Sequence, residues 1–344
     1  MLKNPGMLMK TRQVDYVQAF PQAPLLEGRE TVYMQIPDRY QTSPGSNKKV
    51  LKLKKNFLYR LCQASYNWSN LLCSGLEKLG FTQTLSLMKE DIICCICVNN
   101  TLFVFAKTDE IIDVHIKQLQ DINFELTDEG DVEDFLGVKI DKPDQESSKM
   151  SQPAFTDTII TTLLGLNTNA STKQHKTPEV SPPLKNAALE GEPCEEKWNY
   201  RSVIGMLIYY LSRNTRPDIE YAVHQCARFQ LNPKKKIQEN TAAVKHIGGR
   251  YLLGTKDKGI IFIPDLSSKS ELNCYVDADF AGNYTRDTGD DPNNVRSRTG
   301  CIMIKFAGCP IHWFSRLQTE ISLSTTEAEY IALVSTACRE LLPM

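Results

Sequence analysis

Three closely spaced cysteines are the first residues whose type could do chemistry. Cys94, Cys95 and Cys97 lie in an apolar run, and thiolates are common zinc ligands. In an extended strand Cys95 and Cys97 point to one face and Cys94 to the other, and no second ligand pair follows at zinc-like spacing. A buried thiol also packs well as a small apolar group. The pattern therefore favours core packing over a metal centre.

Two clusters of lysines could contact phosphate groups. The second covers residues 234–236, and the first consists of Lys48, Lys49, Lys52, Lys54 and Lys55. Lysine neutralises backbone phosphate, but such a run is equally typical of a solvated loop or strand edge. The formal net charge of −1 gives no overall attraction to nucleic acid, so any such surface must be local. Both interpretations stay open, with Lys52 and Lys54 as candidate contacts.

Acidic residues gather near the carboxyl end of the sequence. Asp277 follows a strand predicted over residues 272–276, and Asp279 points to the same side because side chains alternate along a strand. Glu327 falls three residues after Ser324, which is the spacing of a capping box, in which the glutamate bonds back to the start of its helix. Glu329 is predicted to be a surface helix residue.

A hairpin over residues 91–106 is the element around which the first half is organised. Two apolar runs flank Asn99-Asn100, and a two-residue Asn turn joins strands tightly. Both runs are apolar almost throughout, which predicts burial on both faces at the centre of a sheet. Further strands are predicted over residues 11–20 and 30–37.

Helices and short strands alternate in the rest of the sequence. A broad apolar face that includes Tyr66 predicts a helix from Leu58 to Leu79, closed by Gly80. The other predicted helices cover residues 111–119, 155–164 and 325–342, with a largely helical region over 198–253; strands cover 124–130, 134–140, 259–263, 272–276, 301–306 and 311–314; linkers cover 141–150 and 166–196.

Length and composition limit the number of domains and the class of protein. The 344 residues suffice for two domains, and 41% hydrophobic with 24% charged content is typical of globular proteins. Eleven cysteines follow no disulfide framework, and no signal peptide or long apolar run is visible. The expected location is therefore a reducing intracellular compartment, cytoplasmic or nuclear, without membrane insertion.

Seven short motifs occur in a fixed order along nearly the whole sequence. Together they resemble the reverse transcriptase and RNase H part of copia-type retrotransposon polyproteins. The motifs are residues 14–20 (VDYVQAF), 58–68 (LYRLCQASYNW), 135–138 (FLGV), 200–205 (YRSVIG), 216–219 (RPDI), 275–282 (YVDADFAG) and 324–330 (STTEAEY).

The resemblance implies an α+β fold in three parts. Residues 1–145 would form a partial right-hand polymerase palm with the fingers mostly missing, and residues 146–265 a helical thumb-like or connection region. Residues 266–344 would form the first half of a truncated RNase H-like α/β domain. The family also implies an RNA template and an RNA–DNA hybrid as partners and Mg²⁺ as cofactor, and leaves the oligomeric state open.

For the polymerase half, the resemblance assigns metal ligands. The family holds two Mg²⁺ ions with one Asp before an Ala-Phe pair and with an Asp-Asp pair at a hairpin turn. Asp15 matches the first, but Asn99 and Asn100 stand at the pair. An amide offers a carbonyl oxygen without the charge that offsets a divalent cation, so polymerase chemistry is expected to be lost. Gln63 matches a residue that lines the nucleotide or template, or is an ordinary polar residue at a helix start.

For the hydrolase half, the resemblance makes Asp277 and Glu327 catalytic metal-ligand candidates, beside the capping role of Glu327. Asp279 stays uncertain. Such a site needs about four carboxylates around two ions, and the family's later acids would follow residue 344, so little hydrolysis is expected.

A glycine pair interrupts the predicted helical region. Gly248-Gly249 stands where the family has helix formers, and one extra residue there would turn the rest of the helix by about 100°.

An alternative function belongs to another class. It is a non-catalytic RNA- or DNA-binding module that uses the two lysine clusters.

Overall fold

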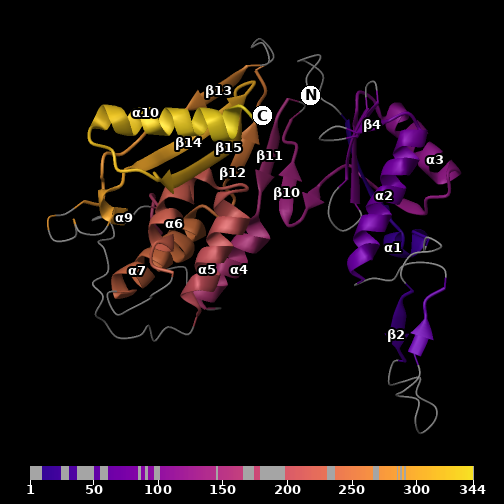
Figure 1. Cartoon of the computed structure of the whole chain (residues 1–344), viewed down its shortest axis with the longest axis horizontal. Coiled ribbons are helices and arrows are strands. Elements are labelled where there is room, and N and C mark those ends of the chain that lie inside the picture. The colour runs from indigo at the N-terminus through magenta and orange to yellow at the C-terminus, as the bar shows by residue number, and fades with distance from the viewer. Residues whose placement is uncertain are drawn as a thin grey trace, which may run out of the picture. The chain divides into compact units, whose positions relative to one another are not determined.

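The structure, a computed structural model, forms two compact units, each built from helices and strands (Figure 1). The first unit ends at Val132 and the second begins at Glu133, whereas the sequence suggested a boundary at residue 145. The described residues are 10–24, 31–36, 50–54, 61–83, 87–89, 92–96, 101–144, 146–165, 174–178, 198–230, 237–265, 271–284, 286, 289 and 292–343.

A six-stranded antiparallel sheet is the centre of the first unit. Its order is β4-β5-β6-β7-β1-β8, so the predicted hairpin, β6 and β7, lies in the middle as expected. The strands are β1 (Lys10–Tyr16), β4 (Thr82–Gln83), β5 (Leu87–Lys89), β6 (Ile92–Ile96), β7 (Thr101–Ala106) and β8 (Leu126–Gly130). A separate ribbon pairs β2 (Tyr33–Gln35) with β3 (Val50–Lys52).

The core of this unit lies on one face of the sheet, beneath α2 (Cys62–Lys78) and α3 (Asp109–Asp121). Val104 and Ala106 are buried there, whereas Phe105, between them, is only half-buried. Cys94 and Cys95 differ in the same way. The expected burial on both faces is therefore wrong for these positions. Ile92, Ile93 and Cys94 are all buried, so the expected burial on both faces is confirmed at that end of β6.

Helix α2 begins at Cys62, later than the predicted start at Leu58, because Leu61 is an extended residue that precedes it. Gly80, just past its end, has φ +90°, a backbone conformation that glycine adopts without steric cost, so the predicted terminating glycine is confirmed. Trp68, Leu72 and Leu76 are buried on the sheet. Tyr66, predicted to share that face, is 64% exposed.

The second unit begins with a four-stranded sheet in the order β12-β11-β10-β9. Residues 134–140 are not one strand, because Leu136 and Gly137 both have positive φ and turn the chain within two residues. Part of the predicted linker 141–150 is a strand. The bounds are β9 (Asp134–Phe135), β10 (Val138–Asp141), β11 (Ser148–Ser151) and β12 (Gly259–Phe262).

Helices follow, as the pattern predicted, and share one apolar core that includes Ile159, Leu207, Leu211 and Tyr251. Several are short, and two are π-helices. They are α4 (Pro153–Leu164), α5 (Tyr200–Met206), η3 (Leu207–Ser212), η4 (Pro217–Ile219), α6 (Glu220–Ala227), α7 (Ile237–Val244), η5 (Lys245–Tyr251) and α8 (Leu252–Gly254).

The π-helix η5 contains Gly248 and Gly249. A π-turn holds one more residue than an α-turn, so it absorbs an inserted residue without rotating the rest of the helix. Tyr251 and Leu252 are buried in the helical core, and the rotation relative to the family stays a prediction. The glycines let η5 approach α4, because a Cβ on Gly248 would overlap Leu163 Cδ1.

Replacing Gly248 with alanine should therefore lower the free energy of unfolding by about 1–3 kcal/mol, since the added methyl overpacks this crossing. Gly205→Ala is the matched control: Gly205 is also helical, but nothing lies within 4 Å of its added Cβ. That variant should gain up to about 1 kcal/mol from helix propensity. Thermal melts of both variants measure the difference, and equal effects would contradict close packing at Gly248.

The chain ends in a three-stranded antiparallel sheet, ordered β13-β14-β15, with α10 packed on it (Figure 1). Ala328 and Ala332 are fully buried, so they form the inner face of α10. Trp313 Nε1 donates to the Ser212 carbonyl at 2.6 Å and so joins this sheet to the helices. The elements are β13 (Leu272–Tyr275), α9 (Pro292–Val295), β14 (Arg298–Phe306), β15 (Cys309–Leu317), α10 (Thr325–Thr336) and the π-helix η7 (Ala337–Leu341).

Candidate catalytic sites

Asp15 lies on the open face of the first sheet. Its neighbours Val14 and Tyr16 point into the core, so strand alternation directs Asp15 the other way. β1 runs between β7 and β8, where Asp15 is paired with Thr101 and Thr127. A single carboxylate is thus held at the middle of a rigid sheet, on the face that the helices leave uncovered.

The same pairing places Asp15 opposite Thr101, the residue that follows Asn100 in the sequence. Asn99 and Asn100 themselves lie outside the described residues. Ile96 pairs with Leu102, which leaves residues 97–101 between them, an odd number. The predicted two-residue turn at Asn99-Asn100 stays a prediction.

Asp15 has an acidic neighbour. Burial in the sheet and the nearby carboxylate of Glu129 raise the pKa of Asp15 above its ordinary value. Glu129 in turn accepts a hydrogen bond from Gln13. Negative charge is therefore disfavoured at Asp15 unless a cation offsets it. Among the described residues, however, no group of three or more His, Cys, Asp or Glu side chains could hold a metal ion.

The proposed nucleic-acid contacts of the first unit are all at the surface. Gln63 is exposed in the first turn of α2, where its carbonyl accepts from Asn67 Nδ2 at 2.9 Å. Lys52 is exposed on β3 opposite Tyr33, and Lys54 is exposed just beyond that strand. Residues 48, 49, 55 and 234–236 lie outside the described part of the chain.

Asp277 and Asp279 follow β13 and have different surroundings. Asp279 accepts from the Arg298 amide at 2.6 Å, and its own amide donates to the Arg298 carbonyl at 2.9 Å. Asp277 accepts from the Gly300 amide through its backbone carbonyl at 2.7 Å, and its side chain is exposed. Asp279 is thus committed to holding the loop against β14, while the Asp277 carboxylate is available to a ligand.

Glu327 and Glu329 on α10 make different contacts: Glu327 caps its helix, and Glu329, predicted to be a surface residue, contacts another segment. Glu327 Oε2 accepts from the Leu323 amide at 2.7 Å, and its own amide donates to Ser324 Oγ at 3.1 Å, which is a helix cap. Glu329 Oε1 accepts from the Ala278 amide at 3.3 Å. Glu329, and not Glu327, therefore reaches the loop that carries Asp277.

Comparison with known proteins now identifies the family. A model of the family described as reverse transcriptase (RNA-dependent DNA polymerase) matches residues 9–178. The chain is 30% identical, over 95% of its length, to the retrovirus-related Pol polyprotein from transposon TNT 1-94 of Nicotiana tabacum. The chain belongs to this reverse transcriptase family of copia-type Pol polyproteins.

Further relatives include a second Pol polyprotein and an uncharacterized protein. The retrovirus-related Pol polyprotein from transposon RE1 of Arabidopsis thaliana is also 30% identical over 95% of the chain. An uncharacterized mitochondrial protein of the same plant is 30% identical over 69% of the chain and 88% of its own length. The chain spans 24% of the tobacco Pol polyprotein and 21% of RE1. It therefore corresponds to one segment of these polyproteins.

The RPDI motif, residues 216–219, forms a buried network of hydrogen bonds around Arg216, which we call the Arg216 lock. Arg216, 1% exposed, donates from Nε and Nη2 to the two oxygens of Asp218, each at 2.9 Å. Its Nη1 and Nη2 also donate to the carbonyl and hydroxyl of Thr255. Tyr251 OH donates to Asp218 at 2.7 Å. The motif thus ties η4 to the end of the helical region.

The raised pKa of Asp15 predicts a stability effect. The folded state holds the Asp15 proton more tightly than the unfolded state does, so stability falls as pH rises above about 4. Asp15→Asn should therefore raise the melting temperature of the first unit at pH 7, with a smaller gain at pH 3.

Glu110 on α3 gives the opposite sign, because a hydrogen bond from Thr108 and one from the backbone lower its pKa. Its contribution is present at neutral pH and is lost in acid. Glu110→Gln should therefore lower the melting temperature at pH 7. A fall in melting temperature for Asp15→Asn would contradict the electrostatic assignment.

No helix within the described ranges is long and apolar enough to cross a membrane.

Proposed function

We propose that this chain is a reverse transcriptase segment that keeps the polymerase scaffold but has lost efficient polymerisation. One observation supports the proposal: Asp15 pairs with Thr101, and the two residues before Thr101 in the sequence are Asn99 and Asn100. Two-metal phosphoryl transfer needs several anionic oxygens around the ions. Asp15 supplies one of them, and the two amides supply no charge.

The residues present do not fit a two-Mg²⁺ polymerase site. Mg²⁺ prefers carboxylate and phosphate oxygens in near-octahedral geometry. Glu129 is the acidic neighbour of Asp15, and it already accepts from Gln13. The described residues of this half therefore do not support a catalytic step through bound metal.

A primer-extension assay tests this proposal. The chain should incorporate no deoxynucleotides on an RNA template, with either Mg²⁺ or Mn²⁺, above the level of an Asp15→Asn variant. Incorporation that disappears in Asp15→Asn would overturn the proposal, because it would show that one carboxylate suffices.

A non-catalytic nucleic-acid-binding module is the second candidate. The ribbon β2–β3 favours it, because Lys52 lies opposite Tyr33, which is 59% exposed. A cation beside an exposed ring can contact phosphate and stack on a base. Salt-dependent affinity for an RNA–DNA hybrid, weakened in Lys52→Gln and Tyr33→Ala, would support this function without any incorporation.

For the second unit we propose a weak RNase H-like metal site formed by Asp277 and Glu329. The contact between Glu329 and the Ala278 amide supports this site. Asp277, whose carboxylate is exposed, directly precedes Ala278 in the chain. Two carboxylates fit one Mg²⁺ ion, which would supply charge at a scissile phosphate when bound. They fall short of the four that efficient hydrolysis uses, so any cleavage of an RNA–DNA hybrid should be slow.

The two glutamates give a matched pair of variants. Glu329→Gln should weaken Mn²⁺ binding, measured by calorimetry, with little loss of stability. Glu327→Gln should keep Mn²⁺ binding but lower stability by about 0.5–2 kcal/mol, because it weakens the helix cap. The reverse result would assign Glu327 as the ligand instead.

A further inference from the structure

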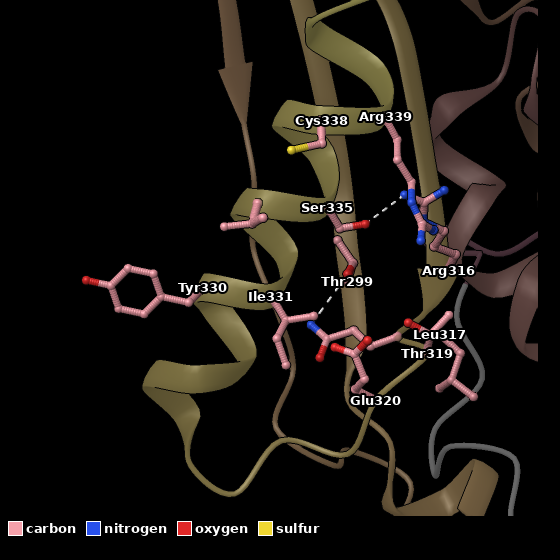
Figure 2. Close-up of a pocket in the computed structure, with 12 residues that line it drawn as sticks. Thr299, Arg316, Leu317, Thr319, Glu320, Tyr330, Ile331, Ser335, Cys338 and Arg339 are labelled. Carbon is pink, nitrogen blue, oxygen red and sulfur yellow. Dashed lines mark hydrogen bonds between the residues drawn. The ribbon is translucent and has the colours of Figure 1, made fainter.

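A cavity of about 460 Å³ lies between α10, η7 and the end of β15 (Figure 2). Its volume falls in the range of ligand pockets, roughly 300–1,000 Å³. Arg316 and Thr319 line it from the sheet side, and Ile331, Ser335 and Arg339 line it from the helix side. None of the proposed catalytic carboxylates lines it.

The cavity adjoins the Asp277–Glu329 site at Thr299, which pairs with Ala278, but its two arginines lie away from that site. On α10, Ile331 and Ser335 lie about 200° and 240° around the helix from Glu329, so they face away from it. β13, which leads to Asp277, is one edge of the sheet, and β15, which carries Arg316, is the other. The inference therefore does not depend on the polymerase or hydrolase proposals.

Arg316 is a pre-oriented cation in the cavity wall. Its Nη2 donates to Ser335 Oγ at 3.1 Å, as Figure 2 shows, and its Nη1 lies 3.4 Å from Glu340 Oε1. The guanidinium group also lies over the Phe314 ring, 4.6 Å from its centroid. Three contacts thus hold one planar donor group in place, which lowers the entropy lost when it binds a ligand.

Arg339 contributes a second guanidinium to the same cavity. Within the described part of the chain it makes no hydrogen bond or ion pair. Figure 2 shows its side chain directed toward the end of the cavity where Arg316 lies, with Glu320 at the other end. Glu340 partly offsets the charge of Arg316, whereas no described carboxylate pairs with Arg339, so this end of the cavity favours an anion.

We propose that this cavity binds a phosphate group through Arg316 and Arg339. Guanidinium groups bind phosphate oxygens with paired, charge-assisted hydrogen bonds. The hydroxyl of Ser335, which accepts from Arg316, keeps its own proton free to donate to a third oxygen. The phosphate belongs either to a nucleic-acid strand or to a free anion, and the test separates these sources.

Cys338 provides a reporter, because it lines the cavity and its thiol is exposed. Its alkylation by N-ethylmaleimide is followed by mass spectrometry at constant ionic strength, with EDTA present to exclude metal-dependent binding. Inorganic phosphate and a single-stranded DNA 12-mer are titrated separately. At least one of the two ligands should slow alkylation of Cys338 in the natural chain.

Arg339→Gln should shift the protection midpoint roughly 10- to 100-fold, as expected for the loss of a charged hydrogen bond. Arg250→Gln, also an exposed helical arginine of this unit, should leave the midpoint unchanged. Protection by the DNA alone identifies a strand phosphate, and protection by inorganic phosphate alone identifies a free anion. Absence of protection by both, or an unchanged midpoint in Arg339→Gln, overturns the proposal.

Discussion

Replacing Arg216 with methionine should lower the free energy of unfolding of the second unit by about 1–3 kcal/mol. The guanidinium is 1% exposed and holds both carboxylate oxygens of Asp218. Methionine fills similar volume but donates nothing, so Asp218 and the Thr255 carbonyl lose the hydrogen bonds from Arg216. The cost comes mainly from these lost hydrogen bonds, because the Asp218 carboxylate is partly exposed and keeps the hydrogen bond from Tyr251 OH.

The same ion pair makes the free energy of unfolding of this unit depend on pH in acid. Burial raises the pKa of Asp218, but the hydrogen bonds and charge of Arg216 outweigh burial, so the pKa lies below its ordinary value of 3.8. A lowered carboxylate pKa stabilises the fold above the unfolded pKa, and this contribution is lost as pH falls through the folded one. The natural unit should lose stability below about pH 4, and Arg216→Met should show a weaker pH dependence, because Tyr251 and Lys258 still lower the pKa of Asp218.

Urea unfolding of the variants at pH 7 measures the effect. Arg201→Met, at an exposed position on α5, is the control and should change stability by less than about 0.5 kcal/mol. Asp218→Asn should cost less stability in the Arg216→Met background than in the natural chain, because the two residues interact directly. Normal stability for Arg216→Met would show that the Arg216 lock does not stabilise the second unit.

Local sequence patterns predicted the strongly apolar elements and missed the polar ones. The hairpin strands and α2 are rich in apolar residues at the right spacing, and both were found. β11 has the sequence Ser-Lys-Met-Ser, which carries no strand pattern, and its pairing with β10 and β12 comes from partners distant in the sequence. Leu136 adopts positive φ beside Gly137, which no preference of leucine suggests.

The same limit applies to the candidate sites. Asp15 could be placed because Val14 and Tyr16 mark the buried face of a short strand. The choice between Glu327 and Glu329 could not be made, because both flank the buried face of α10 formed by Ala328 and Ala332. Which flank faces the Asp277 loop depends on how the helix crosses the sheet, and that is a property of tertiary packing.

Restoring both carboxylates at the hairpin turn should restore polymerisation. The double variant Asn99→Asp with Asn100→Asp adds two anionic ligands next to Asp15, which the register with Thr101 already holds at that turn. Aspartate and asparagine have similar size and turn preference, so the backbone should be unchanged. Because each metal contact contributes several kcal/mol of transition-state stabilisation, primer extension should rise on the order of 100-fold or more.

Two controls separate charge from conformation. Asn99→Ala with Asn100→Ala should stay inactive, since it changes the turn without adding charge. Adding Asp15→Asn to the carboxylate variant should abolish the restored activity, because the ions would lose the ligand that β1 supplies. If the carboxylate variant binds Mn²⁺ but extends no primer, the amides are not the sole cause of inactivity. If it fails to bind Mn²⁺ at all, Asp15 does not face the turn in the way that the strand pairing requires.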